Sequence, residues 1–131
     1  MATLTDEQAK LFEGKPFASV ATTNADGSPQ LSYAWVEWDG ENVVLNTTAA
    51  RVKGRNLRRD PRVVVMVVDP ENPYRWLSVK GHAEVTEEGA VEHIDELSRR
   101  YWGRDYDLKP GMTRLIVRIR PERVNTYGFE S

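Results

Sequence analysis

The stretch Phe17-Ala18-Ser19-Val20-Ala21-Thr22-Thr23 is made of small, β-branched and aromatic residues and predicts a β-strand. The residues that follow, Asn24-Ala25-Asp26-Gly27-Ser28, are typical of a turn. A second strand is expected from Gln30 to Trp38, and Asp39-Gly40 then indicates a hairpin, whose central residues need positive φ. A third strand from Asn42 to Thr47 returns. These strands predict an antiparallel meander.

On either side of the meander, the patterns predict more strands than helices. Thr5 and Gln8 form a possible capping box for a short first helix that Gly14 and Pro16 would end. The elements expected after the meander are a short helix ended by Pro61, a central strand Val63–Asp69, a long strand Tyr74–Val85 bent at Gly81, a helix from Thr86 to Trp102 closed by Gly103, a strand Thr113–Arg120 ended by Pro121, and a last short strand Val124–Gly128.

Six or seven short strands with one substantial helix predict a mainly β fold, a β-barrel with flanking helices and Greek-key order. Closure of a barrel removes unpaired strand edges. We see no internal repeat, low-complexity stretch or linker, so residues 1–131 are expected to form a single domain.

Composition limits the function classes. The chain has no cysteine, which excludes disulfides and thiolate metal sites, and His82 and His93 lack carboxylates at metal-ligand spacing, so no metal is expected. No apolar run approaches the roughly 20 residues that span a bilayer. Without a signal-peptide pattern, the expected location is the cytoplasm and no membrane partner is expected. The net charge of −2 gives no overall attraction to nucleic acid.

The segment from Arg51 to Arg62 holds six basic residues and one acidic residue. One interpretation is a solvated helix face with surface ion pairs. The other is a phosphate site, because Lys53 and the first free N–H groups of a helix that starts after a loop can converge on one anion. In either case we expect Lys53 and Arg58 to be solvated. The segment contains no aromatic residue, so a single-stranded nucleic-acid site is not expected.

Several stretches together resemble, in their order and spacing, the split-barrel flavin and deazaflavin oxidoreductases, which are relatives of the pyridoxamine 5'-phosphate oxidases. These stretches are Gly27-Ser28-Pro29-Gln30-Leu31-Ser32, Asp39 to Thr47, Arg51 to Arg62, Tyr74 to Gly81, Arg100-Tyr101-Trp102-Gly103 and Arg118 to Val124. The resemblance implies an FMN-binding split barrel and a homodimer. It also implies a cofactor held between the subunits and hydride transfer to or from a small organic substrate.

Two departures bear on the cofactor. The chain has Val52-Lys53 where the enzymes that use flavin mononucleotide (FMN) carry adjacent Arg and Lys, and Ser32 where they carry Arg. From the resemblance, we also expect no counterpart of their C-terminal substrate segment. The pattern from Arg51 to Pro61 is more similar to the branch that uses the deazaflavin coenzyme F420, whose phosphate and oligoglutamate tail are anionic. The alternatives are an FMN-dependent enzyme and a non-enzymatic flavin or deazaflavin carrier or sensor.

The resemblance also implies site residues. Arg51 and Lys53 would bind the phosphate. The full implied cofactor-binding set is Gln30 and Ser32 beside the ring, Asn46, Thr47 and Thr48 near the phosphate and ribityl chain, the basic-segment residues Arg51, Val52, Lys53, Arg55 and Asn56, and Trp76 reaching the site of the other subunit. The remaining tryptophans, Trp35, Trp38 and Trp102, are expected in the core or an interface. No catalytic acid or base is evident.

Overall fold

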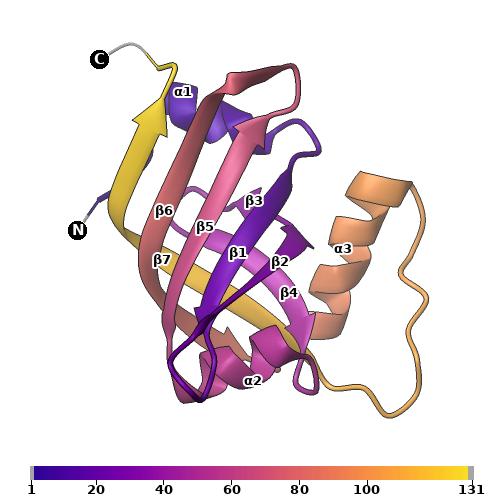
Figure 1. Cartoon of the computed structure of the whole chain (residues 1–131). Helices are drawn as coiled ribbons and strands as arrows, with labels where there is room; N and C mark the ends of the chain where they lie inside the picture. The colour runs from indigo at the N-terminus through magenta and orange to yellow at the C-terminus, as the bar shows by residue number, and fades with distance from the viewer. Residues whose placement is uncertain (1, 130–131) are drawn as a thin grey trace.

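The computed structural model describes residues 2–129, which form one curled antiparallel sheet with helices packed around it (Figure 1). The helices are α1 (Asp6–Ala9), the 3-10 helix η1 (Lys10–Phe12), α2 (Val52–Arg59) and α3 (Ala90–Trp102). The strands are β1 (Phe17–Thr23), β2 (Pro29–Trp35), β3 (Glu37–Trp38), β4 (Val43–Thr48), β5 (Arg62–Asp69), β6 (Asn72–Thr86) and β7 (Arg114–Tyr127). The mainly β class is therefore confirmed.

The strand order is β2-β1-β5-β6-β7-β4-β3, so the two edges of the sheet are consecutive in the chain. They are joined through Val36, at which the predicted second strand divides. Residues before Val36 pair with β1, whereas Glu37 and Trp38 pair with β4. The backbone N–H of Val36 donates to the Tyr101 hydroxyl on α3, 3.1 Å away, instead of to a strand. At this break the chain passes from one edge of the curled sheet to the other.

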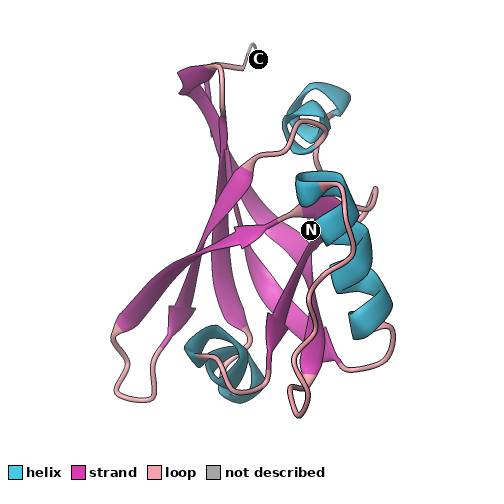
Figure 2. Ribbon diagram, turned by 90° about the vertical axis from the view of Figure 1, so that its right-hand side faces the viewer, coloured by secondary structure: helices cyan, strands magenta, loops and turns pink. Residues whose placement is uncertain are grey.

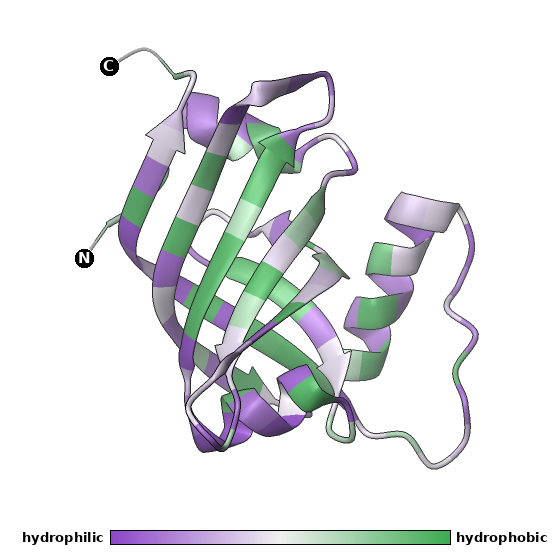
Figure 3. Ribbon diagram, viewed as in Figure 1, coloured by the Kyte–Doolittle hydropathy of each residue, from purple (hydrophilic) through white to green (hydrophobic). Residues whose placement is uncertain are grey.

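The core fills the inside of the curled sheet, where alternate residues of each strand point. Val20, Val65 and Val79 are completely or almost completely buried, one from each of three neighbouring strands. Figure 3 shows that β5 is apolar along most of its length, and it lies between β1 and β6 as the prediction of a central strand requires. Its second face, with Val64 and Val68, is exposed in the single chain.

The prediction that Pro121 ends a strand is wrong. Strand β7 runs through Pro121 without interruption and pairs with β6 on both sides of it. The pairing register shifts at this point, because Lys80 faces Arg123 while Gly81 faces Pro121, which leaves Glu122 as the extra residue. Proline is tolerated at such a bulge because the regular ladder is already interrupted there. The bend predicted at Gly81 is this irregularity.

The helices lie along one side and at one end of the sheet, as Figure 2 shows. The capping box of Thr5 and Gln8 is present at the start of α1. Helix α3 starts later than predicted, at Ala90, because Thr86 is still paired in β6 and Gly89 then makes the turn with positive φ. Helix α2 ends before Pro61, whose ring favours the extended conformation that Asp60 adopts.

Candidate functional site

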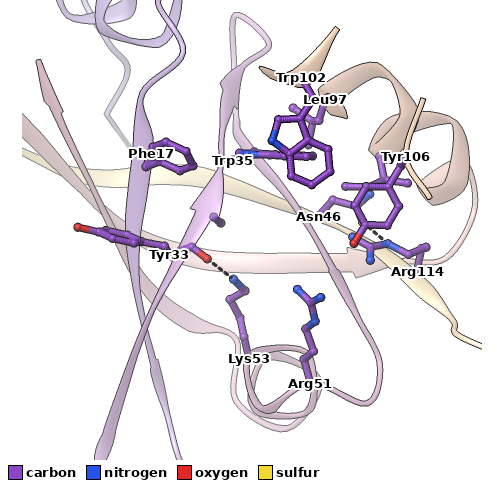
Figure 4. A pocket seen from close by; sticks show the side chains of 12 residues that line it. Phe17, Tyr33, Trp35, Asn46, Arg51, Lys53, Leu97, Trp102, Tyr106 and Arg114 are labelled. Carbon is purple, nitrogen blue, oxygen red and sulfur yellow. Dashed lines mark hydrogen bonds between the residues drawn. The ribbon is translucent and has the colours of Figure 1, made fainter. Parts of the chain in front are cut away.

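A cavity of about 260 Å³ lies between the β1–β2 hairpin, the first turn of α2, helix α3 and the loop that follows α3 (Figure 4). Its lining residues are Phe17, Tyr33, Ala34, Trp35, Asn46, Arg51, Lys53, Ile94, Leu97, Trp102, Tyr106 and Arg114. Figure 4 shows that the basic side chains approach from α2 and β7, whereas most of the aromatic rings lie on the opposite side. The cavity therefore has a cationic end and an aromatic end.

The cationic end is formed by Arg51, Lys53 and Arg114. Within residues 2–129, no carboxylate lines the cavity to balance these charges. Lys53 is only 6% exposed and Arg114 only 5%. The Lys53 ammonium donates one hydrogen bond, to the backbone carbonyl of Tyr33, at 3.3 Å. Buried charges are usually paired, so an unbalanced cluster of this kind suits an anionic ligand.

Burial has a direct electrostatic consequence for these cations. Burial, together with the smaller effects of the nearby charges of Arg51 and Arg114, lowers the pKa of Lys53 from 10.5 to about 8. Burial also lowers the pKa of Arg114. An anion bound among the three cations would oppose both effects and favour the charged forms. The expectation that Lys53 is a solvated charge is therefore wrong.

The placement of Arg51 and Lys53 follows from where α2 begins. Arg51 is the N-cap residue and has an extended backbone, so the helix starts after a loop rather than running through the whole basic segment. Lys53 then lies in the first turn, where backbone N–H groups have no partner within the helix. The Arg51 side chain reaches the same cavity. This is the second of the two geometries that the sequence left open.

Gly54 allows this first turn to lie directly against the end of β4. A Cβ added at Gly54 would lie 2.0 Å from the backbone oxygen of Thr48, which is closer than any real contact. Glycine is otherwise unfavourable in a helix by about 1 kcal/mol relative to alanine. The close approach of the backbone explains why glycine occupies this position.

We expect Gly54→Ala to lower the free energy of unfolding by about 1.5 kcal/mol, because the cost of overpacking exceeds the gain in helix propensity. Urea unfolding followed by circular dichroism measures this difference. Gly14→Ala is the matched control, since a Cβ at Gly14 meets nothing within 4 Å. A Gly54→Ala protein as stable as the wild type would show that α2 does not pack this closely.

Asn46 connects the cavity to the layer behind it. Its Oδ1 accepts a hydrogen bond of 2.8 Å from Arg114 Nε, and its amide nitrogen donates to the Ala90 carbonyl at 2.9 Å. The same nitrogen lies 3.0 Å from Nδ1 of His93, whose Nε2 is 2.6 Å from a carboxylate oxygen of Glu37. These side chains come from four different elements, so the position of Arg114 depends on the packing of α3 against the sheet.

The aromatic end of the cavity is arranged around Trp35. Tyr101 stacks on the Trp35 ring with a centroid distance of 5.2 Å, and Trp102 meets it edge to face at 4.6 Å. Tyr106, in the loop after α3, lies parallel to Trp102 at 6.2 Å and is 5.0 Å from the Arg114 guanidinium. Such a set of rings can stack against a planar ligand.

The structure brings three of the implied site residues, Asn46, Arg51 and Lys53, together in the cavity. The neighbouring Thr47 and Thr48 are fully buried behind it, and Thr48 accepts a hydrogen bond from the Arg51 backbone N–H at 3.3 Å. Thr47 Oγ1 and Ser32 Oγ have no hydrogen-bond partner within residues 2–129. Neither residue lines the cavity.

The other implied residues lie elsewhere. Gln30 accepts a hydrogen bond from the Thr22 hydroxyl at 3.1 Å, and Asn56 donates to the same hydroxyl at 3.0 Å. Val52 and Arg55 are exposed and do not line the cavity. Trp76 stacks on Tyr127 with a centroid distance of 6.2 Å, outside the cavity.

Arg114, Trp35, Trp102 and Tyr106 line the cavity but were not among the residues expected at the cofactor. Trp102 is 54% exposed, so it is not a core residue. Arg114 faces Thr48 directly in the β4–β7 pairing, a relation across 66 positions that no local pattern reveals. Only a prediction of strand pairing could have placed Arg114 beside the basic segment.

The curled antiparallel sheet with a cationic cavity at its side can be compared with the folds and sequences of known proteins. A family model for pyridoxamine 5'-phosphate oxidase matches residues 4–128. The chain belongs to this family, as the ordered motifs predicted, and its fold is the split barrel.

Several solved structures share this fold with the chain at different levels of sequence identity. An F420 reductase is 31% identical, with a TM-score of 0.82 over 93% of this chain and 98% of that chain. A conserved hypothetical protein from Mycobacterium tuberculosis is 29% identical, with a TM-score of 0.77 over 97% of this chain and 86% of that chain. HutZ, the heme storage protein from Vibrio cholerae, has a TM-score of 0.73 over 98% of this chain and 97% of that one, but at 22% identity it shows only a shared fold.

Two further properties of residues 2–129 bear on membranes and metals. None of the helices in this range is long and apolar enough to cross a membrane. No group of three or more His, Asp or Glu side chains in the same range is arranged to hold a metal ion.

Proposed function

We propose that this protein is an oxidoreductase that binds the deazaflavin coenzyme F420 in the cavity, with the cofactor phosphate among Arg51, Lys53 and Arg114. The observation that carries the proposal is a buried lysine in a three-cation cluster with no lining carboxylate in the described part of the chain. A bound deazaflavin supplies the hydride chemistry, and the protein binds and orients it. The 31% identity to an F420 reductase supports this choice of cofactor.

The arrangement of the cavity suits a planar, anionic ligand of this type. Cations at one end would hold the phosphate, and the rings around Trp35 would flank a flat ring system. A second cavity of about 110 Å³ shares Arg51 and Arg114 with the first and adds Lys109, together with Asp107. Lys109 is one further cation near the proposed phosphate position, and the charge of Asp107 opposes it, so the preference for coenzyme F420 over FMN rests on the sequence departures and on the likeness to an F420 reductase.

Equilibrium titration of the purified apoprotein with coenzyme F420 and with FMN, followed by fluorescence, tests the proposal. We expect tighter binding of coenzyme F420, because Val52 and Ser32 stand where FMN enzymes carry cations. Hemin is a useful third ligand, since a heme storage protein shares the fold. Equal or tighter binding of FMN would favour the FMN-dependent alternative, whereas tight binding without turnover of any substrate would favour a carrier or sensor.

We also propose that the functional unit is a homodimer formed through the outer face of the sheet. The strand pairing places Leu31 and Tyr33 of β2 beside Ala21 and Ser19 of β1, which in turn lie beside Val64 and Met66 of β5. Leu31 and Tyr33 are more than 70% exposed. This exposed face continues to Trp76 and borders the cavity at Phe17 and Tyr33, so a second subunit there would help to enclose the cofactor.

Sedimentation equilibrium at micromolar concentration is expected to give about twice the 15.0 kDa chain mass. Val64→Lys, which adds a charge to the outer face beside Lys80, should shift the protein towards monomer and weaken cofactor binding. Val91→Lys is the control, because Val91 is similarly exposed but lies on α3. A monomer that binds the cofactor tightly would refute the shared site.

A further inference from the structure

The strongest unexplained feature of the molecule is a buried chain of polar side chains that leads from the cavity to solvent. It runs from Arg114 through Asn46 and His93 to Glu37, with successive separations of 2.8, 3.0 and 2.6 Å. Asn46 and His93 are each less than 9% exposed, whereas the Glu37 side chain is about one third exposed. Only Arg114 and Asn46 line the cavity.

Each hydrogen bond in this chain fixes the direction of the next. Arg114 Nε can only donate, so Asn46 must present Oδ1 to it. The Asn46 amide nitrogen then faces the Ala90 carbonyl and His93 Nδ1. Since an amide nitrogen is a donor only, His93 Nδ1 must be the unprotonated acceptor, and its Nε2–H donates to Glu37. The arrangement therefore requires a neutral imidazole in one tautomer.

We propose that His93 is a positioning residue for the anion site, which as a neutral imidazole holds the Asn46 amide and thereby the guanidinium of Arg114. The proposal rests on the proposed function in that Arg114 is taken to contact the anion. A second proton on His93 would place an N–H donor opposite the Asn46 amide donor. If the amide turned over to accept from His93, its nitrogen would face Arg114 Nε and Arg114 would lose its acceptor. If it did not turn over, the two facing donors would push the Asn46 amide away from His93 and disturb its contact with Arg114.

The charged side chains around His93 are the other groups that a change of pH could affect. Glu37 on β3 contacts it directly, and Arg114 on β7 acts through Asn46. Arg118, also on β7, lies in register with Val44, which itself faces Glu37, and donates to the Thr86 hydroxyl at 3.1 Å. On α3 itself, Glu92 and Glu96 are exposed. Imidazole is the side-chain type whose charge ordinarily changes between about pH 5 and 8.

Two substitutions of His93 distinguish its role as a hydrogen-bond acceptor for Asn46 from its ability to take up a second proton. Asparagine at position 93 can place an oxygen near the Nδ1 position and cannot titrate, so His93→Asn should bind coenzyme F420 like the wild type near neutral pH. Glutamine reaches the Nε2 position instead and can still contact Glu37, but it leaves the Asn46 amide nitrogen with the Ala90 carbonyl as its one remaining acceptor among the described residues. We expect His93→Gln to bind about tenfold more weakly, the size of one lost hydrogen bond. His82→Gln is the control, because His82 is exposed and contacts Glu122.

The experiment measures the dissociation constant of coenzyme F420 and, in the apoprotein, the ¹⁵N–¹H signal of Arg114 Nε, across about pH 5 to 8. The signal is assigned by its loss in Arg114→Lys. As the pH falls, wild-type binding and the protection of this N–H from exchange should both decrease more than in His93→Asn. If His93 had only a structural role, the wild type and His93→Asn would show the same dependence of binding and of N–H protection on pH.

Equal affinity in His93→Gln and the wild type, with the same pH profile in His93→Asn, would overturn the proposal. If the wild-type protein binds neither coenzyme F420 nor FMN, the proposed function fails. The Arg114 N–H signal of the apoprotein still decides whether His93 positions Arg114, because that readout needs no ligand. Its pH-dependent loss in the wild type but not in His93→Asn supports the inference, and identical behaviour in both proteins overturns it.

Discussion

Replacing Lys53 by methionine is expected to weaken binding of coenzyme F420 by about 1.5–3 kcal/mol, the range for a hydrogen bond to a charged group. Methionine keeps much of the volume of the lysine side chain and removes its charge from a position that is 6% exposed. Arg51 and Arg114 remain in the cavity, so binding should be reduced rather than abolished. Fluorescence titration of both proteins measures the difference.

Arg58→Met is the matched control within the same helix. The Arg58 side chain is about half exposed, lies outside the cavity lining and faces Glu87 at 3.6 Å. We expect this substitution to leave the affinity unchanged. If Arg58→Met weakened binding while Lys53→Met did not, the ligand would lie on the other face of α2. If neither substitution mattered, the basic segment would be the solvated helix face of the alternative interpretation.

Salt and pH add two independent checks on Lys53. Raising the ionic strength should weaken binding by the wild type more than by Lys53→Met, because the ionic contribution is the part that salt screens. Wild-type affinity should also fall as the pH rises past about 8, where the buried ammonium loses its proton. Lys53→Met should show neither this extra salt dependence nor this loss above pH 8.

The parts of the fold that depend on local chemistry could be predicted from the sequence. The capping box at Thr5, the helix end at Gly103 and the apolar run of β5 each involve only a few neighbouring residues, and each is present. The position of Pro121 shows the limit of such reasoning. Whether proline ends a strand or lies in a bulge depends on the partner strand, whose register cannot be derived from the residues around Pro121.

The same limit applies to the candidate site. Arg51 and Lys53 could be predicted because one short segment contains the loop, the helix start and the cations. Arg114 could not, because it reaches them only through the pairing of β7 with β4. Trp35 lies in the cavity because the end of α3 and the loop after it pack over β2, which is a tertiary arrangement. The roles of Gln30 and Trp76 stay predictions, since neither residue lines the cavity in the single chain.

The buried charge of Lys53 should also lower the stability of the apoprotein, so Lys53→Met should be more stable than the wild type. Lys53 has a pKa of about 8 in the folded protein and an ordinary value of 10.5. At neutral pH this difference corresponds to a cost on the order of 3 kcal/mol, because folding disfavours the charged form. We therefore expect Lys53→Met to melt about 5–10 °C above the wild type without ligand.

The dependence on pH has a definite sign. Between about pH 8 and 10.5 the unfolded chain keeps the Lys53 proton while the folded protein has released it, so the unfolded state binds more protons. The free energy of unfolding must then rise with pH in this window, by an amount that Lys53→Met lacks. Tyr101, whose pKa burial raises, titrates alike in both proteins, so the difference between them isolates Lys53. Urea unfolding at about pH 7 and about pH 9.5 measures it. If the wild type and Lys53→Met had the same stability at both pH values, the Lys53 charge would already be balanced in the apoprotein. The cavity would then hold no unbalanced positive charge to attract an anion.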